Sequence, residues 1–120
     1  PPDKLFNQNY SVVLVHPSDA VREQAQEILA KTQGQINIYL YNANDENSDV
    51  DWLLSCSKMS NVVVLDYDNC PNHVKTLGSY LVSLPNVFWL TKEAEAVYTN
   101  LSGNRIYDLS FLTTGDFCES

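Results

Sequence analysis

The sequence predicts a three-layer α/β sandwich, in which helices cover both faces of a mainly parallel sheet of four to five strands. Three observations favour this class. Short apolar segments alternate with amphipathic segments along the 120 residues, as they do when helices connect successive strands. Residues 62–65 are a continuous apolar run that ends at Asp66, which is typical of a central parallel strand buried on both faces. A hydrophobic share of 44% is enough for one packed core.

The first half of the chain predicts two strands and two helices. We expect residues 1–10 to form an N-terminal arm and residues 11–120 to form a single domain. Ser18 or Asp19 caps the first helix, because a short side chain with an oxygen accepts hydrogen bonds from the free amides of a first turn. Gly34 follows as the stop signal of that helix. The predicted elements are a strand, a helix, a strand nearer the sheet edge and a short helix, over residues 11–15, 18–32, 36–41 and 49–59.

The second half continues the same alternation. Pro71 and Asn72 open a helix after the central strand, because proline is suited to a first helical position. With right-handed crossovers, the complete order gives a small flavodoxin-like or Rossmann-like domain. The remaining elements are a fourth strand, a short amphipathic helix and a fifth strand, over residues 87–91, 92–100 and 105–109.

Charge and composition exclude several classes of function. Seven basic and fifteen acidic residues give a formal charge of −8, which disfavours direct binding to nucleic acid phosphates. No apolar run approaches the roughly 20 residues of a membrane span, and the first residues have no signal-peptide character. Three cysteines without a Cys-x-x-Cys pair favour neither a disulfide framework nor a structural zinc site. We therefore expect a cytoplasmic protein that does not bind membranes.

Polar residues follow the predicted strands at the edge where parallel strands end. In an open α/β sheet, ligands bind beyond the carboxyl ends of the strands, near the position where the strand order reverses. We therefore expect these residues to line one rim and to bind a nucleotide-like small molecule there. The candidates are His16, Asn42, Asp66, Asp68, Thr91, Tyr107 and Asp108.

Asp66 and Asp68 are the most specific pair in this set. Two carboxylates at a strand end can share a hard cation such as Mg²⁺, which would hold a phosphate that Thr91 or Lys92 contacts. In an enzyme, we expect Asp66, Asp68 and Thr91 to be the catalytic set. The competing interpretation is structural: Asp66 caps the following helix or turn, Asp68 is solvated, and the domain uses neither metal nor cofactor.

A second group of acids precedes and begins the predicted helix at residues 49–59. It consists of Asp45, Glu46, Asp49 and Asp51. One interpretation is a solvated loop and helix start. The other is a surface that binds a basic protein partner through charge complementarity.

Glycine-rich phosphate loops and nucleophile elbows are missing from the sequence. The first glycine is Gly34, so no glycine-rich turn follows the first strand, and no Gly-x-Ser-x-Gly motif occurs. These absences argue against dinucleotide binding of the Gly-x-Gly-x-x-Gly kind, against a P-loop and against a nucleophile elbow.

Four segments in order carry a second kind of signal: residues 51–54 (Asp-Trp-Leu-Leu), 61–66, 75–81 (Lys-Thr-Leu-Gly-Ser-Tyr-Leu) and 87–90 (Val-Phe-Trp-Leu). Through these segments about half of the chain resembles the nucleoside 2-deoxyribosyltransferase-like family. In that family a Trp-bearing helix, a buried strand and a Glu-Leu-Gly helix follow one another within a flavodoxin-like fold. The resemblance implies a nucleoside-like ligand. Thr76 stands at the position of the family's nucleophilic glutamate, so the resemblance does not extend to transferase activity.

The opening segment, residues 13–23, together with the strand that ends at Asp66, resembles a response-regulator receiver. Asp66 takes the position of the phosphoacceptor. His16 and Pro17 take the position of the acidic pair that holds magnesium in receivers, and no lysine follows the fifth predicted strand. The resemblance therefore implies an acidic pseudo-receiver, a regulatory domain without phosphorylation.

The Asp-Tyr-Asp segment that begins at Asp66 is similar to the Asp-x-Asp of haloacid-dehalogenase-like phosphatases and of Toprim domains. The phosphatases carry this motif on the opening strand and need a later acidic motif, which this chain is too short to provide. Toprim domains need a glutamate after the first strand, where this chain has His16. Each resemblance thus lacks a residue that the chemistry requires.

The sequence as a whole predicts an enzyme-like domain that works by binding a protein partner or a nucleotide-like ligand, without catalysis. Two alternatives stay open. One is a divergent enzyme that processes a nucleoside or a phosphate around Asp66 and Asp68. The other is the pseudo-receiver.

Overall fold

The computed structural model describes residues 10–42, 49–75, 84–92 and 104–113. Its core is a five-stranded sheet in which every pair of neighbouring strands is parallel, in the order β2-β1-β3-β4-β5. The predicted small flavodoxin-like α/β sandwich is therefore confirmed. The strands are β1 (Tyr10–Val15), β2 (Ile36–Tyr41), β3 (Val62–Asp66), β4 (Val87–Leu90) and β5 (Arg105–Ile106).

Strand β3 lies in the middle of the sheet, as its sequence predicts. All five of its residues are buried. It pairs with β1 on one side and with β4 on the other, both parallel. Because helices cover both faces of a parallel sheet, a central strand needs apolar residues at every position rather than at alternate ones.

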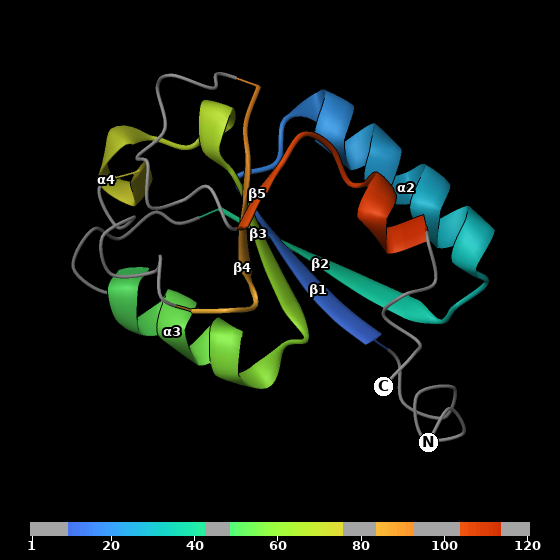
Figure 1. Cartoon of the computed structure of the whole chain (residues 1–120), viewed down its shortest axis with the longest axis horizontal. Helices are drawn as coiled ribbons and strands as arrows, with labels where there is room; N and C mark the ends of the chain where they lie inside the picture. Colours follow the sequence, from blue (N-terminus) through green and yellow to red (C-terminus); the bar gives the residue numbers. More distant parts are fainter. Residues whose placement is uncertain (1–9, 43–48, 76–83, 93–103, 114–120) are drawn as a thin grey trace.

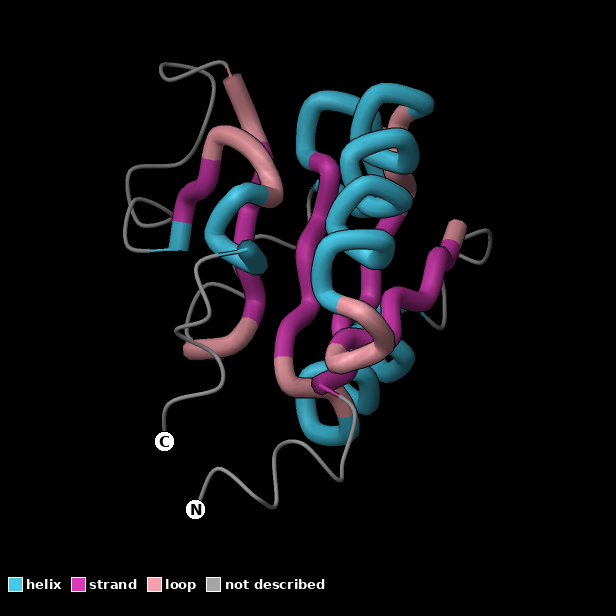
Figure 2. The backbone as a smooth tube through the Cα atoms, turned by 90° about the vertical axis from the view of Figure 1, so that its right-hand side faces the viewer, coloured by secondary structure: helices cyan, strands magenta, loops and turns pink. Residues whose placement is uncertain are grey.

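Helices cover both faces of this sheet (Figures 1 and 2). The longest helix, α2, packs with the short helix η3 on one face, and α3 and α4 lie on the other. Among the helices that the structure describes, none is long and apolar enough to cross a bilayer. The helices are α2 (Asp19–Thr32), α3 (Asp49–Met59), η1 (Tyr67–Asn69), α4 (Asn72–Lys75) and η3 (Ser110–Thr113).

Alternate residues of the strands divide the core into two apolar layers. Val13, Leu65 and Trp89 face α3 and α4, whereas Leu14 and Val64 face α2 and η3. Period-two alternation within each strand produces this division. Both layers are closed by helices, so the carboxyl edge of the sheet is left to carry polar groups.

The tryptophans contribute to one of these layers. Trp89 is fully buried, as expected for a core residue. Trp52 is half-buried and stacks on Tyr41, with ring centroids 3.3 Å apart. This stacking fixes α3 against the end of β2.

The last strand is shorter than its sequence pattern predicts. It ends at Ile106, and residues 107–109 form a bend. The Asp108 side chain accepts hydrogen bonds from the Ser110 backbone N–H at 2.9 Å and from its hydroxyl at 2.6 Å. Such local bonds from an aspartate to its own backbone compete with a sheet ladder. The predicted helix at residues 92–100, apart from Lys92, lies outside the described residues, and so do residues 76–83 of the helix that the sequence predicts to begin at Pro71 and Asn72.

Candidate functional site

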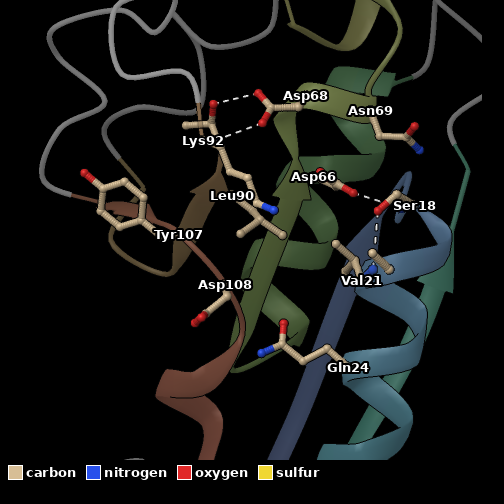
Figure 3. A pocket seen from close by; sticks show the side chains of 12 residues that line it. Ser18, Val21, Gln24, Asp66, Asp68, Asn69, Leu90, Lys92, Tyr107 and Asp108 are labelled. Carbon is tan, nitrogen blue, oxygen red and sulfur yellow. Dashed lines mark hydrogen bonds between the residues drawn. The ribbon is translucent and has the colours of Figure 1, made fainter.

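A cavity of about 310 Å³ lies at the carboxyl edge of the sheet (Figure 3). Its walls come from the start of α2, from the ends of β3 and β4, and from the residues after β5. Strand β2 lies on one side of β1, while β3, β4 and β5 lie on the other, so the strand order reverses between β1 and β3. Doubly wound sheets bind their ligands beside this reversal.

The connection from β1 to α2 is a sharp turn at His16. His16 has a φ of 52°, in the left-handed region that side-chain-bearing residues rarely adopt. Its backbone N–H donates to the Tyr41 carbonyl at 2.8 Å, and its own carbonyl accepts from the Asn69 side chain at 2.9 Å. These two bonds hold the turn between the ends of β2 and β3, which places the start of α2 beside β3.

Ser18 and Asp66 join the start of α2 to the end of β3. The Ser18 hydroxyl accepts from the Val21 N–H at 3.3 Å and so caps the helix, as predicted. The Ser18 N–H donates to Asp66 Oδ2 at 2.8 Å. Asp66 therefore stabilises the start of the helix that precedes it in the chain. Its side chain makes no capping bond to η1, so the expectation that it caps the following helix or turn is wrong.

Burial changes the acidity of Asp66, because the side chain is only 6% exposed. Burial raises its pKa above 3.8, since an ionised carboxylate loses hydration there. Hydrogen bonds from Ser18 oppose this shift, the charge of Asp68 adds to it, and the charge of Lys92 opposes it. The net pKa is raised, which is a frequent property of groups in functional cavities.

Asp68 joins η1 to the end of β4. Its Oδ1 accepts from the Thr91 hydroxyl at 2.7 Å, and its Oδ2 accepts from the Lys92 N–H at 2.9 Å. Asp68 is exposed, but it is not simply solvated, because both of its oxygens have protein donors. This contact fixes Thr91 and Lys92 at the cavity wall.

The segment after β5 closes the cavity opposite Asp66. Gln24 of α2 accepts from the Leu109 N–H at 3.0 Å, which ties this segment to α2. The hydrogen bonds from Ser110 lower the pKa of Asp108, so its carboxylate stays ionised. Tyr107 is 62% exposed, and the Arg105 guanidinium lies 4.5 Å from its ring centroid.

Five of the seven residues predicted for the rim line this cavity: Asp66, Asp68, Thr91, Tyr107 and Asp108. His16 and Asn42 do not, although His16 shapes the turn beside it. Of the acidic group, Asp51 is exposed on α3, while Asp45, Glu46 and the Asp49 side chain lie outside the described residues.

The sequence pattern did not identify Gln24 and Asn69 as cavity residues. Gln24 lies in the second turn of α2, and Asn69 ends η1. The packing of α2 against Leu109 and η3, which follow β5, brings Gln24 to the site. No periodicity in the sequence signals that packing.

The geometry does not favour a shared cation between Asp66 and Asp68. Figure 3 shows Asp66 turned toward Ser18 and Asp68 turned toward Lys92. Within the described ranges, no group of three or more His, Cys, Asp or Glu side chains is placed to hold a metal ion. The two acids instead join neighbouring segments of the fold.

No protein-family model, curated protein or solved structure matches this chain. The function must therefore be inferred from the cavity itself.

Proposed function

We propose that this domain is a non-catalytic binding module, an enzyme-like fold that holds a small polar molecule in the cavity at its sheet edge. The observation that carries this proposal is the cavity beside the strand-order reversal, whose candidate acids are already bound by protein donors. Its volume of about 310 Å³ is in the range of small-molecule sites.

The hydrogen bonds of the acids support binding rather than catalysis. A general acid or base must reach the proton that it transfers, and a metal-binding pair must converge on one point. Asp66 is bound to Ser18, and Asp68 is bound to Thr91 and Lys92. Both carboxylates are thus engaged in holding the cavity walls together.

A second candidate function is a divergent enzyme centred on Asp66. The raised pKa of this buried carboxyl favours it, because such a group can exchange protons nearer neutral pH. In that case Asp66→Asn abolishes turnover of a nucleoside or phosphate substrate while the fold is retained. The binding proposal instead expects a bound molecule to be recovered unchanged.

We propose that this domain is cytoplasmic. The thiols of Cys56 and Cys70 are free, which suits a reducing compartment.

A protein partner for the acidic group around Asp51 is a separate hypothesis. Charge reversal there should weaken such a complex and flatten its salt dependence.

Retention of small molecules tests the binding proposal directly. The purified protein is incubated with a metabolite extract, filtered free of unbound molecules, and denatured for mass spectrometry. Ala20→Phe places a large ring at the cavity wall, while Ala30→Phe puts the same ring on an exposed part of α2 away from the cavity. We expect wild type and Ala30→Phe to retain a molecule, unchanged, that Ala20→Phe loses. Equal retention by all three proteins, or recovery of a converted product, contradicts the proposal.

A further inference from the structure

We infer that the molecule held in this cavity carries a protonated amine, which lies among the carboxylates of the walls. This inference rests on the proposed function and specifies its ligand. It depends on two observations: a buried carboxylate that can accept a further donor, and an excess of negative charge around the cavity.

The first observation concerns the carboxylate of Asp66, which lines the cavity and is 6% exposed. Among the described residues, Ser18 is the one that donates hydrogen bonds to it, with its N–H on Oδ2. A carboxylate has about four lone-pair sites, so Asp66 has the capacity for a further donor. Unused acceptor capacity on a buried carboxylate is costly, and a cationic N–H donor offsets that cost better than a neutral one.

The second observation is the charge of the walls. Asp66, Asp68 and Asp108 line the cavity, and Lys92 is the one basic residue among the described residues that line it. The hydrogen bonds that hold these carboxylates come from uncharged donors on Ser18, Thr91, the Lys92 backbone and Ser110. With all of these groups ionised, the walls attract a cation and repel a phosphate or carboxylate.

The remaining lining fits the rest of an amine-bearing molecule. Val21 and Leu90 offer apolar surface in the same cavity, so they can pack against a hydrocarbon or ring portion. A nucleotide would bring its phosphates against the carboxylates. The cavity therefore favours an amine with an apolar body over a phosphorylated ligand.

Three matched probes test this inference: benzylammonium, benzyl alcohol and benzoate, which share a ring and differ in charge. Each is titrated into ¹⁵N-labelled protein. The reporters are the amides of Ser18, Lys92 and Leu109, because each donates to an acceptor in the cavity wall. We expect benzylammonium to bind about tenfold more tightly than benzyl alcohol, and benzoate to bind most weakly.

Two lysine variants give a charge-matched control. Lys92→Met removes the cation from the cavity but keeps the backbone N–H that binds Asp68. Lys58→Met makes the same change in net charge at an exposed site on α3, on the other face of the sheet. We expect Lys92→Met to bind benzylammonium about threefold to tenfold more tightly than wild type, and Lys58→Met to match wild type.

The outcomes separate this inference from the proposed function. If benzyl alcohol or benzoate binds at the reporter amides as tightly as benzylammonium, the amine inference is wrong and the binding site stands. The amine inference also fails if Lys92→Met and Lys58→Met bind benzylammonium equally. If no probe shifts the reporters and the retention experiment finds no molecule, the proposed function fails as well.

Discussion

Replacing Asp66 by alanine and by asparagine separates its structural role from its charge. Asp66→Ala removes the acceptor of the Ser18 N–H, a bond of 2.8 Å at the start of α2. Hydrogen bonds to charged groups contribute about 1.5–3 kcal/mol, and the buried carboxylate loses part of this to desolvation. We therefore expect Asp66→Ala to lower the free energy of unfolding by about 1–2 kcal/mol. Asp66→Asn keeps an oxygen in place, so its loss should stay within about 0.5 kcal/mol at neutral pH.

Urea unfolding at pH 7 measures both losses. For a domain of this size the slope m is roughly 1–3 kcal/mol per molar urea, so the alanine midpoint should fall by about 0.3–2 M. The asparagine midpoint should lie close to that of wild type. An alanine midpoint equal to that of wild type would refute this role for Asp66, because the bond to Ser18 would then contribute nothing to the fold.

The pH dependence of the same comparison tests the burial of the charge. Burial raises the pKa of Asp66 above 3.8 in the folded state, so the folded state binds this proton more tightly than the unfolded state. The contribution of Asp66 to stability is then greatest below pH 3.8 and falls as pH rises through the folded pKa. The stability of wild type relative to Asp66→Asn should therefore decrease from pH 3 to pH 7. An increase over this range would contradict the assigned burial.

Three further predictions concern other parts of the fold. Asp68→Ala removes the acceptor of the Thr91 hydroxyl and of the Lys92 N–H. Urea unfolding should therefore show a free energy of unfolding that is lower by about 1–3 kcal/mol. An unchanged midpoint would count against these contacts. Trp89→Ala should lower the free energy of unfolding by about 3–5 kcal/mol, because the side chain is fully buried. In the same assay Trp89→Phe should lower it clearly less. Equal losses for the two variants would disagree with the place of Trp89 in the core. Burial raises the pKa of Cys70 to about 12, so iodoacetamide at pH 8 should label Cys70 only after the protein unfolds. Peptide mass mapping measures this labelling. Rapid labelling of Cys70 in the native protein would contradict the prediction.

Much of the fold could be predicted because its physical signals are local. The apolar run before Asp66 indicated a central strand, and β3 pairs on both sides. Ser18 indicated the start of α2, and Ser18 is its N-cap. The strand order and the early end of β5 were not predicted. Strand order depends on contacts between distant segments, and the end of β5 depends on the Asp108 turn.

The site could be predicted in position but not in detail. Strand ends placed Asp66, Asp68 and Asp108 at one edge, since parallel strands end together. The sequence could not show that Asp66 binds Ser18, because 48 positions separate them in the chain. It also could not show that Gln24 reaches Leu109, which requires α2 to lie beside the end of the sheet. These long-range hydrogen bonds determine which partners the acidic side chains at the cavity have.

A structure of the protein with the molecule that it retains from extract would test the central claim most directly. We expect that molecule in the cavity at the sheet edge, with a nitrogen donor on the Asp66 carboxylate and its chemistry unchanged. A molecule bound elsewhere, with the cavity empty, would contradict the assignment of this cavity as the binding site.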